Sequence, residues 1–359
     1  MTHTMRFATN LAKGILGRPD SEELWHSIIS YIPDEVLAKP DVKILNVAFG
    51  HGTEAKVLVN RMRALGKTAE EIKNSIYLLD KYQVFCNDAK RKGYRNIIHA
   101  DFLTYKFRMK FDVTIGNPPY QNQHGVNSHA LWEDFVTKAH ELTVDGGYIA
   151  MVTPFIGRRK VKQLFFNNNF IAYVAQGVDK YFPGIGSSFC YHIVQKGNPT
   201  STTNFDGLDV DISAYGFIPS YMDENIATLF DELLFGTPLN IQGGGIHSQR
   251  KNLFSDSRTE EFPYEYQHTS SQRRFCSQKC AAMDHKLKVV CSKSGYLKPW
   301  LDTTGIGITE GSWCIPVDTE EEGNKIIEFL NSDKVKLFNS VTGSNTGAHD
   351  PNKYKRLCL

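Results

Sequence analysis

The chain is expected to adopt an α/β fold with a doubly wound, mostly parallel sheet, followed by a second, α+β domain. Over the first two hundred residues, short apolar runs of strand length alternate with longer amphipathic stretches. Such alternation is typical of a parallel sheet covered by helices. The pattern ends at Gly197-Asn198-Pro199 and the polar segment after it. We therefore expect two domains, residues 1–199 and 200–359.

The expected strands are residues 43–47, 76–79, 96–99, 111–115, 148–153, 170–175 and 189–195. Between them, the clearest helix has six apolar residues at spacings of three and four, namely Leu131, Trp132, Phe135, Val136, Ala139 and Leu142. It is expected to end at Asp145-Gly146-Gly147. In the second half, only residues 320–338 are firmly predicted to be helical. Ligands of open α/β sheets bind outside the carboxyl ends of the strands, so the residues that follow each strand are candidates for a site.

Composition narrows the class of protein. The 359 residues suffice for two domains, and 41% hydrophobic with 22% charged residues is an ordinary globular composition. No apolar run is long enough to span a bilayer, and Met1–Asn10 lacks the apolar core of a secretion signal. Seven irregularly spaced cysteines suggest reduced thiols. We expect a cytoplasmic protein without a metal site, since Cys276, Cys280, His285 and Cys291 fit no common zinc spacing.

Glycine and acidic residues follow the first three expected strands. Gly50 and Gly52 allow a tight turn and close approach of a ligand to the backbone. Asp80 ends the second strand, where an acid typically accepts hydrogen bonds from ribose hydroxyls. Asp101-Phe102 follows the third, and such a pair can accept from an adenine amino group while packing on the ring. Each acid alone is more often a solvated strand end, but together they predict a nucleotide-type cofactor site.

The fourth strand leads into Asn117-Pro118-Pro119-Tyr120. Two consecutive prolines fix the backbone and remove two amide donors. The Asn117 amide oxygen and the neighbouring carbonyl can then accept hydrogen bonds at one point, beside an aromatic ring. This arrangement suits a planar base that carries an amino group. A simple turn is the alternative, although a chance match in a chain of this length has a frequency of roughly one in a thousand.

With these motifs, residues 7–197 resemble the S-adenosylmethionine-dependent adenine-N6 DNA methyltransferases of the gamma arrangement, found in restriction–modification systems. The resemblance implies the seven-stranded class I methyltransferase sheet with its last strand antiparallel. It also implies S-adenosyl-L-methionine as cofactor, double-stranded DNA as partner and a cognate restriction endonuclease as a candidate partner. In gamma-arranged enzymes the target-recognition region follows the catalytic motifs, which would assign this role to residues 200–359.

The resemblance also assigns site residues. The family's glycine-turn motif matches Leu45 to Gly52, which places Asn46, Ala48, Gly50 and Gly52 among the cofactor-binding residues. Its ribose-binding acid matches Asp80, its adenine-binding pair matches Asp101 and Phe102, and its catalytic loop matches Asn117, Pro118, Pro119 and Tyr120. Phe7-Ala8-Thr9-Asn10 is the counterpart of the amino-terminal cofactor motif and adds Thr9. Asn46 departs from the family, which usually has an acid there, so its contact with the cofactor's positive end becomes neutral.

The chemistry expected of the loop is stabilisation of a charged transition state. The adenine amino nitrogen is a poor nucleophile because its lone pair is delocalised. Acceptance of its two protons by the Asn117 oxygen and the Pro118 carbonyl would localise that lone pair as charge develops. The base must first leave the duplex, and Tyr120 is its expected stacking partner. Phe189 is a candidate for the opposite face of the base, with core packing as an equal alternative.

Several basic segments are candidates for contacts with DNA phosphates. They are Arg158–Lys160, Gln249–Lys251, Gln272–Phe275, Lys286–Lys288 and Lys353–Arg356. Within methyl transfer, an RNA adenine or protein glutamine methyltransferase is the alternative. A dinucleotide-dependent oxidoreductase also fits the loose glycine motif, and a catalytically inactive DNA-binding subunit is a third class. The absence of a Pro-Cys dipeptide argues against cytosine carbon-5 methylation.

Overall fold

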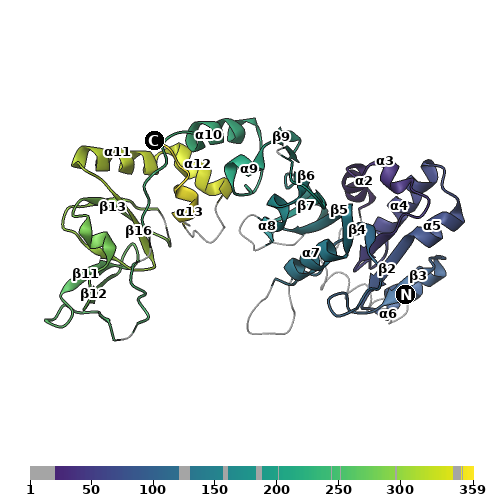
Figure 1. The fold of residues 1–359 in the computed structure, drawn as a ribbon, viewed down its shortest axis with the longest axis horizontal. Helices are drawn as coiled ribbons and strands as arrows, with labels where there is room; N and C mark the ends of the chain where they lie inside the picture. Colours follow the sequence, from purple (N-terminus) through teal and green to yellow (C-terminus); the bar gives the residue numbers. More distant parts are fainter. Residues whose placement is uncertain are drawn as a thin grey trace. The chain divides into compact units, whose positions relative to one another are not determined.

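In the computed structural model the polypeptide forms two units, Met1–Met222 and Asp223–Leu359 (Figure 1). The structure describes residues 21–120, 130–156, 161–182, 188–200, 202–243, 245–250, 252–295, 297–342, 349 and 351–359. Among these, no helix is both long and apolar enough to cross a bilayer.

The first unit is built on a mixed sheet whose described part contains nine strands in the order β3-β2-β1-β4-β5-β7-β6-β8-β9. They are β1 (Ile44–Val47), β2 (Ile76–Asp80), β3 (Asn96–His99), β4 (Phe111–Gly116), β5 (Thr143–Pro154), β6 (Asn169–Val174), β7 (Phe189–Gln195), β8 (Thr203–Phe205) and β9 (Leu208–Val210). Strands β1 to β5 are mutually parallel, whereas β7 is antiparallel to both β5 and β6. The predicted α/β class with a large, mostly parallel sheet is confirmed. Each of the seven expected ranges overlaps a strand of this sheet, and the strand at residues 189–195 is antiparallel, but the sheet has more than seven strands.

The sheet extends beyond the predicted seven strands because β8 pairs in parallel with β6, and β9 returns beside β8. Asp206, in the turn between β8 and β9, links this hairpin to the rest of the first unit through three hydrogen bonds. Its carboxylate accepts hydrogen bonds from the backbone amides of Ala175 at 2.7 Å, Gln176 at 2.9 Å and Met222 at 3.0 Å. These bonds explain why the first unit continues to Met222, past the boundary expected at residues 199 and 200.

Helices cover the sheet of the first unit. They are α2 (Glu22–Ser30), α3 (Asp34–Leu37), α4 (Thr53–Ala64), α5 (Ala69–Ser75), α6 (Gln83–Arg91), α7 (Leu131–Leu142), α8 (Lys162–Phe166), the 3-10 turn η1 (Val178–Tyr181) and α9 (Ile212–Tyr215). The buried faces of α2, α4 and α6 share one apolar cluster with alternate residues of β1, β2 and β4. The buried residues of α7 lie outside that cluster, as a doubly wound sheet requires. The predicted helix ends at Leu142, because Thr143 already begins β5.

The second unit contains two small sheets and four α-helices within its described residues. The sheets have the orders β10-β12-β11-β15 and β14-β13-β16. Their strands are β10 (Phe254–Ser255), β11 (Tyr264–Gln267), β12 (Arg273–Cys276), β13 (Lys288–Ser292), β14 (Trp300–Asp302), β15 (Gly307–Ile308) and β16 (Ser312–Pro316). The helices are α10 (Glu224–Leu234), α11 (Glu320–Asn331), α12 (Asp333–Thr342) and α13 (Pro351–Tyr354), with the 3-10 turn η2 at Ala281–Asp284.

The single helix expected over residues 320–338 is two helices. Ser332 separates them with an extended backbone, at φ −62° and ψ 156°. Its hydroxyl oxygen accepts a hydrogen bond from the backbone amide of Val335 at 3.3 Å. A serine in this conformation caps the start of a new helix, so α12 begins immediately after α11 ends.

A buried ion pair links β13 and β14 of the second unit. Lys288 and Asp302 are both fully buried, and Lys288 Nζ lies 2.6 Å from Asp302 Oδ2. Asp302 also accepts hydrogen bonds from the backbone amides of Thr304 and Ile306. Burial raises the pKa of Asp302, but its hydrogen bonds to Lys288 and Thr304 outweigh that effect and leave the pKa below its ordinary value. Lys288 is therefore wrong as a candidate for DNA contact, since its charge is used inside the unit.

We predict that Lys288→Met destabilises the second unit by about 3–5 kcal/mol, because it leaves the Asp302 carboxylate buried without its cation. Urea denaturation followed by tryptophan fluorescence measures this loss. The double variant Lys288→Met/Asp302→Leu should recover part of it, since the uncompensated buried charge is gone, while the Thr304 and Ile306 amides lose their acceptor. A single variant as stable as the wild type would contradict the structural role of the pair.

His192 in β7 gives the first unit a predictable pH dependence. Its side chain is fully buried, and burial lowers its pKa to about 3. In an unfolded chain the pKa of a histidine is about 6.5. The folded state therefore binds this proton less readily, so its contribution to stability is complete above pH 6.5 and declines as the pH falls towards 3. By pH 5 we expect a loss of about 2 kcal/mol relative to neutral pH.

The measurement is the free energy of unfolding of wild type and His192→Gln from pH 8 to pH 5. Because other groups titrate in both proteins, the difference between the two curves isolates His192. The difference should narrow or change sign on acidification. Parallel curves would show that His192 is not the source of the acid sensitivity.

Candidate active site

A pocket of about 180 Å³ lies at the carboxyl ends of the central strands. Segments that are distant in the sequence meet there: the turn after β1, the ends of β2 and β3, the loop after β4 and the start of α7. The lining residues are Ala48, Leu79, Asp80, Lys81, Tyr82, Asp101, Phe102, Leu103, Pro119, Leu131 and Phe135. Pockets for complete small-molecule ligands usually measure about 300–1,000 Å³, so this one is sized for part of a nucleotide cofactor.

The turn after β1 has the tight backbone that its glycines predict. Ala48, Gly50 and Gly52 have φ values of 52°, 51° and 78°, in the left-handed region that favours glycine. Gly52 is also the residue from which α4 begins. Ala48 lines the pocket, whereas Gly50 is turned toward β2 through a hydrogen bond from its amide to Asp80 Oδ2 at 2.9 Å.

Asp80 connects the glycine turn to the end of β2. Its side chain is only 2% exposed. One carboxylate oxygen accepts from the Gly50 amide and the other accepts from the Tyr82 amide, both at 2.9 Å. A carboxylate oxygen can accept more than one hydrogen bond, so a ligand hydroxyl can bind here in addition to these amides. The sequence predicted only that Asp80 contacts the ribose of a cofactor. The structure adds that Asp80 stabilises the glycine turn after β1 through its hydrogen bond from Gly50.

Asp101 and Phe102 supply a polar edge and an apolar wall. Asp101 is exposed, and its Oδ1 accepts a hydrogen bond from the Leu103 amide at 2.8 Å. The buried ring of Phe102 lies 5.0 Å from that of Phe135 in α7, tilted by 35°. A flat base could lie against this wall with its amino edge toward Asp101. Phe135 was recognised only as part of a helix face, although its spacing of four from Leu131 places both at the pocket.

The loop after β4 begins at a close contact between strands. A Cβ atom on Gly116 would lie 2.4 Å from the Val47 carbonyl oxygen, so only glycine permits this approach of β4 to β1. Asn117 follows and is 3% exposed. Its Oδ1 accepts a hydrogen bond from the Tyr120 hydroxyl at 2.5 Å. Its Nδ2 has no partner among the described residues.

Pro118 is buried, while Pro119 reaches the pocket wall. The prolines thus place the catalytic-loop candidates directly beside the cofactor-site candidates. This adjacency is the geometric requirement for a group transfer between two bound molecules.

Three aromatic rings stack behind the loop. The Tyr120 and Phe189 ring centroids are 4.9 Å apart with a tilt of 42°, and Phe189 stacks on Phe182 at 4.1 Å with a tilt of 20°. A base inserted between Tyr120 and Phe189 would need a separation of about 7 Å, two contacts of about 3.5 Å each. In this structure Phe189 therefore supports the Tyr120 ring from behind. Its contact with a substrate base stays a prediction.

Asn46 is a second buried amide at the end of a central strand. It is fully buried in β1, and neither its Oδ1 nor its Nδ2 has a partner among the described residues. A buried polar group without a partner costs about 1–3 kcal/mol. Asn46 in β1 and the Nδ2 of Asn117, directly after the neighbouring strand β4, are thus buried polar groups without a partner among the described residues, which makes them candidates for contact with a polar ligand. Thr9 and the segment Arg158–Lys160 lie outside the described residues.

Comparison with known proteins agrees with this geometry. Residues 50–176 match the family model described as Eco57I restriction-modification methylase. A curated relative from Mycoplasma pneumoniae (strain ATCC 29342 / M129 / Subtype 1), named "Uncharacterized adenine-specific methylase", is 42% identical over 105 residues. The aligned part is 23% of this chain and 24% of the relative, so the chain spans about a quarter of the relative's length.

Solved structures give distant likenesses. The ATP-dependent Type ISP restriction-modification enzyme LlaBIII, bound to DNA, is 13% identical with a TM-score of 0.44 over 86% of this chain and 35% of that one. The Type I restriction enzyme EcoKI M protein is 13% identical with a TM-score of 0.40 over 50% of this chain and 44% of that one. The type IIG restriction endonuclease BpuSI is 11% identical with a TM-score of 0.42 over 95% of this chain and 58% of that one.

The family model covers the glycine turn from Gly50 onward, Asp80, Asp101 and the whole Asn117–Tyr120 loop. The predicted resemblance to adenine-specific methylases of restriction–modification systems is thereby confirmed, and the order of the motifs is consistent with the gamma arrangement. Residues 50–176 of this chain are therefore similar to the Eco57I restriction-modification methylase family.

Proposed function

We propose that this chain is a site-specific DNA adenine-N6 methyltransferase that uses S-adenosyl-L-methionine. The observation that carries the proposal is the position of the Asn117–Tyr120 loop. It presents a buried amide oxygen and an aromatic ring next to a pocket sized for part of a nucleotide cofactor, which its own Pro119 lines. The match of residues 50–176 to a restriction-modification methylase family supports the same function.

The residues around the pocket fit the proposed cofactor. Asp101 and Phe102 would hold its adenine, and Asp80 would accept from its ribose hydroxyls. Asn46, buried with both amide atoms unpaired among the described residues, would provide a neutral polar contact near its amino-acid end. When bound, the cofactor supplies a methyl group activated by a positively charged sulfur.

The loop residues act on the substrate base. The Asn117 Oδ1 and the Pro118 carbonyl would accept the two amino protons of adenine, which localises the nitrogen lone pair. These hydrogen bonds strengthen as positive charge develops on nitrogen, so they favour the transition state over the ground state. The fixed proline backbone means that the acceptors need little reorganisation during the reaction.

The structure adds a competitor for one of these acceptors. Tyr120 donates its own hydroxyl to Asn117 Oδ1 at 2.5 Å. A carbonyl oxygen has two lone pairs, so an incoming amino group either uses the second one or displaces the tyrosine. In both cases the Tyr120 hydroxyl orders Asn117 before the substrate arrives, while the ring face provides the stacking surface.

We predict that Tyr120→Phe retains turnover within about threefold, because the ring that stacks on the base is unchanged. Tyr120→Ala should weaken binding of target DNA by roughly 1–3 kcal/mol, the worth of one stacking contact. Steady-state kcat and KM for both variants make the comparison. If Tyr120→Phe loses as much activity as Tyr120→Ala, the hydroxyl rather than the ring is the functional group.

Duplex DNA is the proposed substrate, and its target adenine must be flipped out of the helix to reach the loop. We assign recognition of the sequence to the second unit, in agreement with the expected role of residues 200–359. Its exposed residues include Arg273, whose guanidinium lies 4.7 Å above the Trp300 ring and 3.7 Å from a Glu265 carboxylate oxygen. Such a cation on an aromatic platform can contact a phosphate without losing its support.

Calorimetric titration of the full chain tests the cofactor assignment. S-adenosylmethionine should bind with one site per chain, and NAD should not compete with it. Preferential binding of NAD would support the oxidoreductase alternative and overturn the proposal. Fluorescence of 2-aminopurine at the target position of a duplex then tests extrusion of the base, since loss of stacking in the helix brightens the probe.

A further inference from the structure

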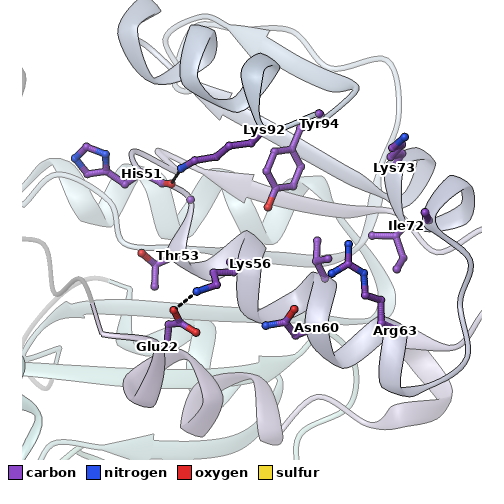
Figure 2. A pocket seen from close by; sticks show the side chains of 14 residues that line it. Glu22, His51, Thr53, Lys56, Asn60, Arg63, Ile72, Lys73, Lys92 and Tyr94 are labelled. Atoms are coloured by element: carbon purple, nitrogen blue, oxygen red, sulfur yellow. Dashed lines mark hydrogen bonds and ion pairs between the residues drawn. The ribbon is translucent and has the colours of Figure 1, made fainter. Parts of the chain in front are cut away.

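A second pocket, of about 580 Å³, lies in the first unit along α4 (Figure 2). It is framed by the start of α2, by α4 and α5, and by the segment that follows α6. The lining residues are Glu22, His51, Gly52, Thr53, Lys56, Val59, Asn60, Arg63, Ala69, Ile72, Lys73, Lys92, Gly93 and Tyr94. None of them lines the pocket beside Asn117. Gly52 is the one lining residue that was expected to bind the cofactor, and the charged residues of this pocket have no role in the proposed methyl transfer.

The lining is strongly positive. It contains the four cations Lys56, Arg63, Lys73 and Lys92 against the single carboxylate of Glu22. Lys56 pairs with Glu22 at 2.5 Å, and Lys92 pairs with Asp88 at 2.8 Å outside the lining. Within the described residues, Arg63 and Lys73 have neither an ion pair nor a side-chain hydrogen bond. Two cations at the same end of the pocket are therefore available to a ligand.

The cations come from different elements and define two ends. Lys56 and Arg63 are seven residues apart on α4, which places them on one stripe about 10 Å apart along the helix. Lys92 lies at the Lys56 end of the pocket and donates a hydrogen bond to the His51 carbonyl oxygen at 2.9 Å. Lys73 of α5 lies at the Arg63 end (Figure 2). An anion in this pocket would thus be held from two ends.

Between the two ends lies Tyr94 (Figure 2), and the lining also includes the apolar side chains of Val59 and Ile72. Figure 2 shows the Tyr94 hydroxyl directed toward α4. Burial raises the pKa of Tyr94 above its ordinary value, so this hydroxyl is a neutral hydrogen-bond donor at pH 7. Arginine and lysine around a neutral donor are the groups that bind phosphate oxygens, and the volume is that of a small-molecule site.

We propose that this pocket is a binding site for a ligand with at least two phosphate groups. One group would contact Lys92 and Lys56, and the other would contact Arg63 and Lys73, with the Tyr94 hydroxyl between them. Phosphate is favoured over a single carboxylate because it brings enough charge to offset the excess of cations. The two sources of such chemistry are a small phosphorylated molecule and the backbone of a nucleic acid.

Calorimetry of the full chain with inorganic tripolyphosphate tests the site. We expect one binding site per chain, with an affinity at least tenfold higher than that for orthophosphate, which reaches only one end. Arg63→Gln/Lys73→Gln should weaken tripolyphosphate binding at least tenfold. The matched control is Arg108→Gln/Lys110→Gln, which removes an arginine and a lysine from the exposed segment before β4, outside both pockets. The control should bind tripolyphosphate like the wild type.

Glu22→Gln is expected to strengthen tripolyphosphate binding, which a misfolded variant would not do. It removes the one lining carboxylate and releases Lys56, so it should tighten tripolyphosphate binding severalfold. If the pocket and control double variants weaken tripolyphosphate binding equally, or if Glu22→Gln has no effect, binding depends only on the overall charge of the protein. Either result would overturn the proposal. Competition by duplex DNA of unrelated sequence identifies the source: displacement of tripolyphosphate assigns the site to a nucleic-acid backbone, and its absence assigns the site to a small phosphorylated molecule.

Discussion

Asn117→Ala should lower the rate of methyl transfer by a hundredfold or more, on the order of the effect of removing one transition-state hydrogen-bond partner. The alanine loses the Oδ1 atom that is held at 2.5 Å from the Tyr120 hydroxyl. It does not touch the pocket lining directly. Cofactor affinity should therefore stay nearly unchanged, and the loss should fall on kcat.

The measurement combines single-turnover methyl transfer with calorimetry of cofactor binding on the same preparation. Asn87→Ala is a matched control, because Asn87 is an exposed asparagine of α6 outside both pockets. The control should retain full activity. Near-normal turnover by Asn117→Ala would remove the loop from the mechanism, even if the cofactor still bound.

Asp80→Ala should have the second large effect, and it should lower cofactor affinity more than turnover. It removes both carboxylate oxygens that accept from the Gly50 and Tyr82 amides, and it removes the proposed contact with the ribose. Hydrogen bonds to charged groups contribute about 1.5–3 kcal/mol each, so cofactor affinity should fall at least tenfold, and the glycine turn should lose stability. Turnover at saturating cofactor should fall less, because these contacts are similar in ground and transition states.

Asp101→Ala separates the two roles of the acids. Asp101 is exposed, and the described hydrogen bond of its carboxylate is local, from the Leu103 amide. Its loss should weaken cofactor binding without a comparable loss of thermal stability. An unchanged cofactor dissociation constant in Asp80→Ala would instead assign Asp80 to the shape of the turn alone.

The strands and the strand-end residues could be predicted because their signals are local. Apolar runs with turn residues between them specify β1 to β7, and parallel order brings Asp80, Asp101 and Pro119 to one pocket without further information. The pocket wall from α7 was less evident, because Leu131 and Phe135 belong to an ordinary apolar helix face.

The misjudged features depend on contacts between distant residues. The sheet extends to β9 because β8 pairs with β6, and Asp206 binds backbone amides about thirty residues earlier in the chain. No local sequence pattern predicts these contacts. From the sequence alone Lys288 is expected to be a surface cation, because its ion pair with Asp302 depends on the pairing of β13 with β14. Likewise, the spacing of Tyr120 from Asn117 does not reveal that the tyrosine hydroxyl donates to Asn117 Oδ1, the acceptor that we propose for the substrate amino group.

The most direct test of the central claim is incubation of the full chain with tritiated S-adenosylmethionine and, in parallel, duplex DNA, RNA or protein, followed by digestion and nucleoside or amino-acid analysis. The proposed function predicts label in DNA alone, recovered as N6-methyladenine, and its loss in Asn117→Ala. Label in RNA adenine or in protein glutamine would move the activity to those substrates. Label in none of the three, or in another DNA base, would contradict the assignment of the Asn117–Tyr120 loop to adenine methylation.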